Sequence, residues 1–540
     1  MSDQDSRLDV QQVMNLVVDK MCNNIRYWHD GSNEILEQTL EVFVELVSSY
    51  SSSKTLLGLE TVNFLVHNHV GSNFPFLGYD RDNKHRITFY SALSRLVFSS
   101  SEDMDNMFDR FVAPNLEIMA QLSASPDING MNMKVAIIGA LRDLRGITTS
   151  AYNKRTYNLL FDALYPSSFP LLNRIAQTWY ADADVMTALL KFMQEFVSNK
   201  GQRIYFDQSS ANGILLFRET SNILCAYGSR ILEVPVVSDI YIEKYKGIRL
   251  MLNTLTAALT GNYVNFGIFS LYQDPALQNA LDIALQMCLN IPLADVMTHV
   301  KLSKAFYGCL EVLFRNHLDV LCGLDSKVFL QLVNANHEGL QSVGECLGSA
   351  AFCSALLCSA RPSRVLLTTL ELLLTLPPPS PLSPLPLLLP SPCPAPPHPA
   401  DPQVTGLCAS TVDHLASFLF LNQNRSKPTV ERIRSHMTSE PGVVSQLMST
   451  LFNSLLFAPN SNHWAITRPI LSLLLLDNGA FVDYQRQLGA TQTQENQQKL
   501  GEEFARLTEG LQRSLEVTNR DRFTQRLTIF RVNTRNFLAL

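Results

Sequence analysis

The chain has 540 residues, of which 46% are hydrophobic and 17% are charged, and its formal net charge is −6. This composition excludes an intrinsically disordered chain and is sufficient for a large hydrophobic core. The mild negative charge leaves no electrostatic footprint for nucleic acid, so we expect the partner to be a protein.

The N-terminal segment MSDQDSRLDV is polar and acidic, and no secretory or mitochondrial address is visible in it. Apolar stretches such as 466–476 are too short or too charged to span a bilayer, so we expect a soluble chain without membrane insertion. The ten cysteines are scattered without a C-x-x-C pair. We interpret them as reduced thiols of a cytosolic or nuclear protein that mostly pack inside helices.

Helical periodicity dominates the first two thirds of the chain. Met14, Val17, Val18, Met21 and Ile25 share one face of a helix, and the pattern returns at 36–47. A helix over 186–197 is preceded by Asp182 and Asp184, either of which could cap its first turn. Similar patterns predict helices near 55–67, 86–99, 103–122, 133–145, 168–180, 213–226, 239–259, 275–290, 302–316 and 325–337.

The pattern resumes near residue 406, and no run of period-two alternation indicates a strand. The further helices are predicted near 406–421, 428–437, 441–457, 464–476 and 496–517. So many helices joined by short turns are typical of an array, because each helix pair leaves an apolar face that only the next pair can cover. We therefore predict an all-α fold, a HEAT-repeat-like α-solenoid of antiparallel helix pairs.

Motifs that carry catalysis or metal binding are missing from the sequence. There is no P-loop, no G-x-G-x-x-G and no H-E-x-x-H. His67 and His69 could offer nitrogen ligands to zinc, but helical side chains two residues apart point to different faces. No acid, base or nucleophile cluster is indicated, so we expect no cofactor, no metal and no enzymatic activity.

Three charged segments are candidates for protein contact. The first brings together four carboxylates at the expected start of a helix, Glu102, Asp103, Asp105 and Asp109. They either complement the helix dipole or form an acidic docking patch for a basic protein surface.

The second segment is RDLRG, with Arg142 and Arg145, and the third is GILLFRETS, with Arg218 and Glu219. Charges beside apolar runs usually tie one helix to its neighbour, and direct contact with a partner is the alternative. Near the C-terminus, a basic helix is interpreted as a solvated face; it carries Arg513, Arg520, Arg522, Arg526, Arg531 and Arg535.

Four longer strings are similar to the exportin-7 and Ran-binding protein 17 family, in register from about residue 10 to the C-terminus apart from a proline-rich block. They are LRDLRGI (141–147), FDQSSANGILLFRETSNIL (206–224), AALTGNYVNFGIFSLYQDPALQNAL (257–281) and NRDRFTQRLTIFR (519–531). That family belongs to the importin-β superfamily of helical HEAT solenoids.

The resemblance implies a nuclear export receptor, or karyopherin, which binds protein cargo together with Ran-GTP. It also implies contact with nucleoporins, shuttling between nucleus and cytoplasm through the nuclear pore complex, and a monomeric state. The chain looks like the C-terminal half of such a receptor, so export is expected to be impaired by loss of the N-terminal Ran-binding region. A HEAT-repeat scaffold or adaptor without Ran-dependent transport is the alternative.

The proline-rich block PPPSPLSPLPLLLPSP (377–392) contains three residue types in sixteen positions. Proline, serine and leucine codons that begin with two pyrimidines make it resemble a translated polypyrimidine tract. Codons for Gly344–Cys346 can contain a 5′ splice donor, and codons for Ala400–Asp401 can contain a 3′ splice acceptor. Excision between these two sites keeps the reading frame. A proline-rich linker or an SH3-type ligand is the alternative.

We therefore expect helical repeats in residues 1–343 and 401–540, with 344–400 as a disordered insertion from a retained intron. Prolines at this density forbid a helix across the block.

Overall fold

The computed structural model describes residues 10–27, 33–79, 84–100, 103–207, 209–341, 401–457 and 463–538. Within these ranges the secondary structure is helical, and no strand occurs. The chain divides into two compact units, Met1–Pro292 (unit 1) and Leu293–Leu540 (unit 2). The division falls inside the first predicted repeat region, and the proline-rich block lies outside the described residues.

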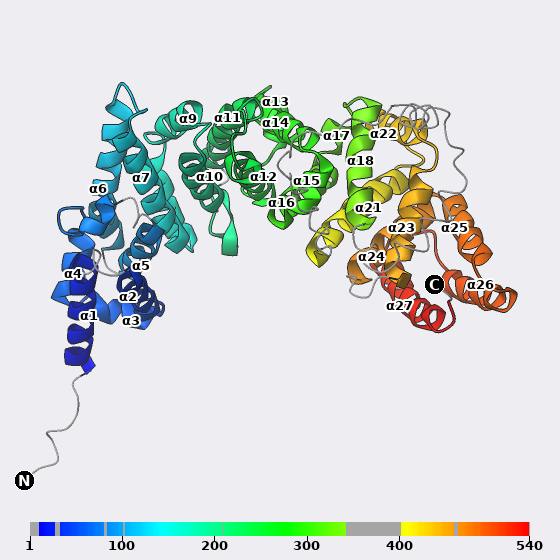
Figure 1. Ribbon diagram of the computed structural model, residues 1–540, viewed down its shortest axis with the longest axis horizontal. Coiled ribbons are helices and arrows are strands. Elements are labelled where there is room, and N and C mark those ends of the chain that lie inside the picture. Colours follow the sequence, from blue (N-terminus) through cyan, green and yellow to red (C-terminus); the bar gives the residue numbers. More distant parts are fainter. Residues whose placement is uncertain are drawn as a thin grey trace, which may run out of the picture. The chain divides into compact units, whose positions relative to one another are not determined.

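Unit 1 begins with helix pairs whose partners are close in sequence (Figure 1). Its helices are α1 (Val10–Tyr27), α2 (Asn33–Leu46), α3 (Tyr50–Leu56), α4 (Glu60–His67), η1 (Pro75–Gly78), α5 (Arg86–Phe98), α6 (Met104–Ala124), α7 (Met131–Ser150), α8 (Lys154–Leu164), α9 (Phe169–Thr178), α10 (Ala183–Val197), η3 (Lys200–Gln202), α11 (Asn212–Ile231), η4 (Tyr241–Tyr245), α12 (Lys246–Thr260), α13 (Gly267–Leu271) and α14 (Ala276–Asn290).

The helices of unit 1 stack in two rows. One row runs α2, α5, α7, α10 and α12, each packed on the next, and the other runs α4, α6, α9, α11 and α14. Contacts between α6 and α7, α9 and α10, and α11 and α12 join the rows. The core lies between the rows and is apolar, so each helix pair is covered by its neighbours, as in a helical repeat array.

Unit 2 follows the same plan. Its helices are α15 (Leu293–Thr298), α16 (Val300–Asn316), α17 (Leu318–Leu321), α18 (Ser326–Gln341), α21 (Pro402–Leu421), α22 (Pro428–Ser439), α23 (Val443–Phe457), α24 (His463–Leu476), α25 (Asn478–Ala490), α26 (Gln494–Thr508) and α27 (Val517–Arg535). One row runs α16, α21, α24 and α27, and the other runs α18, α23 and α25. The predicted all-α fold of stacked helix pairs is confirmed within each unit.

Local sequence signals explain where helices begin and end. Asp182, one of the two predicted caps, is the N-cap of α10 and accepts hydrogen bonds from the backbone N–H groups of Asp184 and Val185, both at 3.1 Å. Asn153 and Thr156 form a reciprocal capping box at the start of α8. The helix predicted over 496–517 ends at Thr508, because Gly510 has a φ of 59° and breaks it.

One glycine sets the distance between α5 and α7. A Cβ atom at Gly146 would lie 2.6 Å from the carbonyl oxygen of Ile87 and 2.9 Å from the Cβ of Tyr90. No side chain fits at these distances, so Gly146 lets the two helices approach at this point.

α21 is long and apolar enough to cross a membrane by length and composition, and α24 with α25 passes that test only as a pair bent by 113°. The expectation that no stretch is long enough is therefore wrong for α21. Within the fold, 56% of its apolar window is buried, and its neighbours are α16, α18 and α24. Packing in the core of unit 2 accounts for its composition.

Candidate functional site

The acidic segment at the start of α6 is exposed. Asp103 is the N-cap residue and accepts a hydrogen bond from Asn106. Asp105 lies two residues further along and pairs with Arg155 of α8 at 2.8 Å, with both side chains more than half exposed. Asp109 is also exposed, and Glu102 lies outside the described residues. We call Asp103, Asp105 and Asp109 the acidic surface.

Asp143, the second residue of RDLRG, is the most deeply buried charge of this region. Its side chain is fully buried and accepts hydrogen bonds from Arg86 of α5, with Nε 2.7 Å from Oδ1. Asn115 of α6 donates to its other oxygen at 3.3 Å, and Arg86 also donates to the backbone oxygen of Leu77. Burial raises the pKa of Asp143 to about 6 against the lowering effect of Arg86. Asp143 therefore joins α5, α6 and α7 and is structural.

Arg142 and Arg145, on either side of Asp143, are half-buried. Lys191 of α10 lies beside them and also beside Lys246 and Arg249 of α12. Burial is the first cause that lowers the pKa of Lys191, and these four cations lower it further. We call Arg145, Lys191, Lys246 and Arg249 the basic surface.

The basic surface was only partly predicted from sequence. Of its four residues, Arg145 was a candidate, as was the neighbouring Arg142, whereas Lys191, Lys246 and Arg249 were missed. The available signal was the i, i+3 spacing of 142 with 145 and of 246 with 249, which places each pair on one side of its helix.

Arg218 and Glu219, the candidates in GILLFRETS, both contact other residues of unit 1. Arg218 of α11 donates from Nε and from its terminal nitrogen to Asp274, at 3.0 and 2.6 Å. Asp274 also accepts from the backbone N–H of Ala276 at the start of α14. Burial alone would raise the pKa of Asp274, but the contacts with Ala276 and Arg218 together lower it. Glu219 is half-buried and accepts from Asn222 at 3.4 Å. Arg218 therefore ties α11 to the start of α14.

The predicted solvated face at the C-terminus is confirmed for Arg513 and Arg522, which are exposed, but not for three of the other arginines. Arg520 pairs with Asp413 of α21 at 3.1 Å, and Arg531 donates to the backbone oxygen of Leu455 at 2.9 Å. Arg535 donates to the backbone oxygen of the next residue of α23. That interpretation is wrong for these three residues, because the carbonyls at the end of α23 and a carboxylate inside α21 need donors.

Neither predicted histidine is placed as a metal ligand. His69 is buried between the rings of Tyr90 and Phe111, with centroids 5.4 and 4.8 Å away, and its Nδ1 lies 3.2 Å from the Tyr90 hydroxyl. Burial lowers the pKa of His69 to about 4. His67 hydrogen-bonds within its own helix, to the backbone oxygen of Asn63 at 2.8 Å. Among the described residues, no cluster of three His, Cys, Asp or Glu side chains could hold a metal ion.

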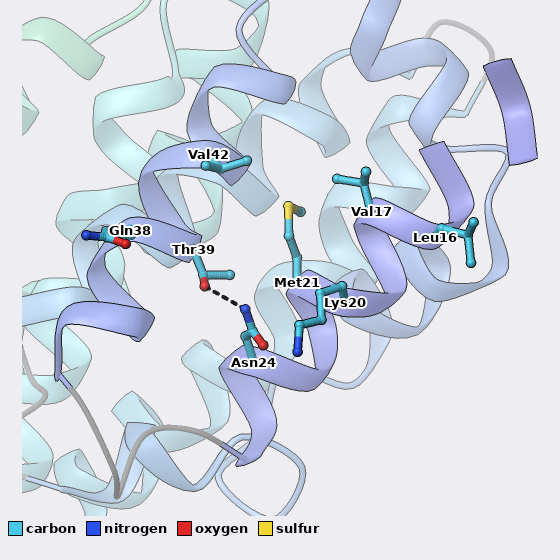
Figure 2. A pocket seen from close by; sticks show the side chains of 8 residues that line it. All are labelled: Leu16, Val17, Lys20, Met21, Asn24, Gln38, Thr39 and Val42. Carbon is cyan, nitrogen blue, oxygen red and sulfur yellow. Dashed lines mark hydrogen bonds between the residues drawn. The ribbon is translucent and has the colours of Figure 1, made fainter. Parts of the chain in front are cut away.

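A shallow apolar groove lies between α1 and α2 (Figure 2). Met21 and Val42 face it from the two helices, while Leu16 is 71% exposed at its edge. The side-chain hydrogen bond from Asn24 to Thr39, at 3.1 Å, spans the groove at one end. It is open and lacks convergent titratable groups, so it suits contact with another apolar helix better than binding of a small molecule.

Comparison with known proteins identifies relatives of this chain. The family described as "Exportin-7-like, TPR domain" matches residues 1–85. Exportin-7-B of Xenopus laevis is 33% identical over 542 residues, and Ran-binding protein 17 of Homo sapiens is 32% identical over 544. Exportin-7 of Dictyostelium discoideum is 28% identical over 527 residues.

Each alignment covers 97% of this chain, and the chain spans 44% to 46% of the length of these relatives. The similarity extends through both units, far beyond the segment that the family model matches. The chain is therefore homologous over nearly its whole length to a part of exportin-7 and of Ran-binding protein 17, the family that the four sequence strings indicated.

Proposed function

We propose that this chain acts in nuclear export, binding protein cargo together with Ran-GTP for passage through the nuclear pore and release in the cytoplasm. The observation that carries the proposal is homology over 97% of the chain to proteins named exportin-7 and Ran-binding protein 17. The two-row stacks support it, because repeat arrays of this kind bind partners across the exposed faces of several successive helices. Nucleoporin contact and shuttling between nucleus and cytoplasm follow from the same proposal.

The acidic surface is the proposed contact for a basic protein surface. Asp105 and its partner Arg155 are 58% and 59% exposed, so water screens this pair and a partner's cation can compete for the carboxylate. Asp103 and Asp109 add negative charge within the first two turns of the same helix. Opposite charge on a partner would fix its register and increase the rate of association.

Nucleotide-dependent binding of Ran tests the proposed function. The 540-residue chain is immobilised and exposed to Ran loaded with a non-hydrolysable GTP analogue or with GDP, with whole exportin-7 as the reference. We expect the GTP form to bind in preference, more weakly than to exportin-7. Equal binding of both forms, or binding to exportin-7 alone, would contradict the proposal; equal binding would favour a HEAT-repeat scaffold without Ran-dependent transport.

The acidic surface is tested separately by charge removal. Asp105→Asn together with Asp109→Asn should weaken capture of a basic protein such as a histone at low salt, by about fivefold for each lost charge pair. Asp483→Asn of α25 together with Glu495→Gln of α26 is the control matched in charge, because both side chains are exposed and each is paired with a cation, at 3.0 and 2.7 Å. Equal losses in the control and the double variant would show that only net charge matters.

We also propose that residues 344–400 interrupt a single helical repeat. α18 ends at Gln341 and α21 begins at Pro402, and these two helices pack on each other within unit 2. Without 344–400, the link between them would be Ser342, Val343 and Asp401, a usual length for antiparallel helices. Asp401 is already the N-cap of α21, accepting from the N–H of Gln403 at 2.9 Å and pairing with Lys304 of α16 at 2.7 Å.

A deletion variant tests this proposal. We expect a chain that lacks 344–400 to keep its helix content and to unfold at the same or a higher temperature than the full chain, because a short loop closes with less loss of entropy. Sequencing of transcripts across the junction is the second measurement. Loss of cooperative unfolding in the deletion variant, or transcripts in the long form alone, would refute it.

A further inference from the structure

The basic surface lies on one side of three neighbouring helices of one row. α7 packs on α10, and α10 packs on α12 (Figure 1). On their other sides these helices contact α6, α9 and α11 of the second row. The half-buried positions 142 and 145 of α7, 191 of α10, and 246 and 249 of α12 follow helical spacing on the side away from the second row.

The three helices run in the same direction and are in register, so their charges lie close together. Lys134 near the start of α7 pairs with Asp182 at the start of α10, at 2.7 Å. Between α10 and α12, Thr254 donates to the backbone oxygen of Leu190 at 3.4 Å, and Asn199 donates to the backbone oxygen of Gly261 at 2.6 Å. Neighbouring helix axes are about 10 Å apart, so the cations occupy a strip about 20 Å wide.

No carboxylate of the described residues forms an ion pair with the basic surface. Glu195 lies near Arg145, but its side chain pairs with Lys200 at 2.7 Å and with Arg203 at 3.2 Å. Asp182 and Asp184 both pair with Lys134.

Two donor atoms of this surface are also unused. The Nε atoms of Arg145 and Arg249 are buried and have no hydrogen-bond acceptor. Each of these guanidinium groups therefore keeps one donor without an acceptor.

Four cations gathered without carboxylates destabilise the folded chain through their mutual repulsion. Burial lowers the pKa of Lys191 most, and the neighbouring cations lower it further. A bound anionic group would offset the repulsion between the cations. Because the cations are half-buried between ridges of helical side chains, an extended acidic side chain can reach them more easily than the wide backbone of a nucleic acid duplex.

We propose that Arg145, Lys191, Lys246 and Arg249, on the shared side of α7, α10 and α12, form a docking site for an acidic segment of a partner protein. Arg142 also lies near Lys191. The aspartate and glutamate side chains of the partner would pair with the guanidinium and ammonium groups. This inference is independent of Ran-dependent export and specifies the chemistry of one partner.

The experiment uses the full 540-residue chain and a fluorescein-labelled peptide in which ten glutamates alternate with serine. Anisotropy should rise on binding at 50 mM salt, and the affinity should fall steeply at 200 mM salt. A peptide with glutamine in place of each glutamate is the probe control. A labelled single-stranded oligonucleotide of equal charge distinguishes a nucleic acid site from a protein site.

Lys191→Gln and Arg249→Gln should each weaken binding of the acidic peptide about fivefold, and the double variant should lose more than tenfold. Lys301→Gln of α16 is the matched control, since Lys301 is an exposed lysine of unit 2; it should change the affinity less than twofold. Circular dichroism checks that each variant is folded. If the double variant unfolds, the affinities of the two single variants are sufficient for the test. Unchanged affinity in the variants, no binding at 50 mM salt, or tighter binding of the oligonucleotide would overturn the proposal.

Discussion

The buried pair of Arg86 and Asp143 gives the sharpest test of how unit 1 is held together. In Asp143→Ala, the Arg86 guanidinium keeps its contact to the backbone oxygen of Leu77 but loses both carboxylate oxygens, and the Asn115 amide loses its acceptor. At 4 Å and an effective dielectric constant of about 20, the lost attraction is worth about 4 kcal/mol. Removal of one partner from a buried ion pair typically costs about 3–5 kcal/mol.

Hydrogen exchange measured by mass spectrometry reports this loss locally. We expect amides of α5 and α7 to exchange about a thousandfold faster in Asp143→Ala, which corresponds to about 4 kcal/mol. The double variant Arg86→Met, Asp143→Leu should recover most of the protection, because apolar side chains of similar size leave no unpaired charge.

Asp105→Ala is the matched control for this prediction. It breaks an aspartate–arginine pair of the same unit that is more than half exposed, so its cost should stay below about 1 kcal/mol. The reasoning is refuted if Asp143→Ala and Asp105→Ala cost the same, or if the double variant is less stable than Asp143→Ala.

Three further outcomes are expected in unit 1. The folded-state pKa of His69 is about 4, below the ordinary value of 6.5. The unfolded chain therefore takes up a proton first, and the free energy of unfolding falls by about 3 kcal/mol as pH falls from about 6.5 to 4. In chemical denaturation at pH 4.5 and 7, His69→Phe should abolish this loss of stability. Gly146→Ala should cost about 1–3 kcal/mol through overpacking, whereas Gly489→Ala, with open space around it, should be neutral or stabilising by thermal unfolding. Arg203→Lys should destabilise the folded chain by at least about 2 kcal/mol. The planar guanidinium donates to the backbone oxygens of Thr148, Ala151, Glu195 and Ser198, and one ammonium cannot replace these contacts. An unchanged melting temperature would contradict this prediction.

The fold class and most helices were predictable because they depend on local periodicity. Apolar residues at helical spacing mark the face that each helix buries, whatever its neighbour. Among the helices of ten or more residues, α8 and α25 were absent from the predicted set, and the shorter helices α13, α15 and α17 were absent as well. α8 is short at eleven residues, although Tyr157, Leu160, Phe161 and Leu164 follow helical spacing, and in α25 only four of thirteen residues are buried.

The candidate site was predicted less well, because a charge cannot be assigned to packing or to partner binding from its own helix. In RDLRG, three charged residues stand within four positions, and the structure separates them. Asp143 points to α5 and α6, whereas Arg142 and Arg145 lie beside Lys191. Helical spacing predicts that their sides differ, but only the neighbouring helices determine which side is buried.

The sequence by itself therefore determined that the chain forms stacked helices and which residues begin several of them, since hydrogen bonding and capping within a helix are local. Only the tertiary structure decided that Arg520 pairs with Asp413, 107 residues away, and that cations of α7, α10 and α12 meet on one surface. These outcomes depend on which helices become neighbours, because electrostatic interaction follows distance in space and not separation along the chain.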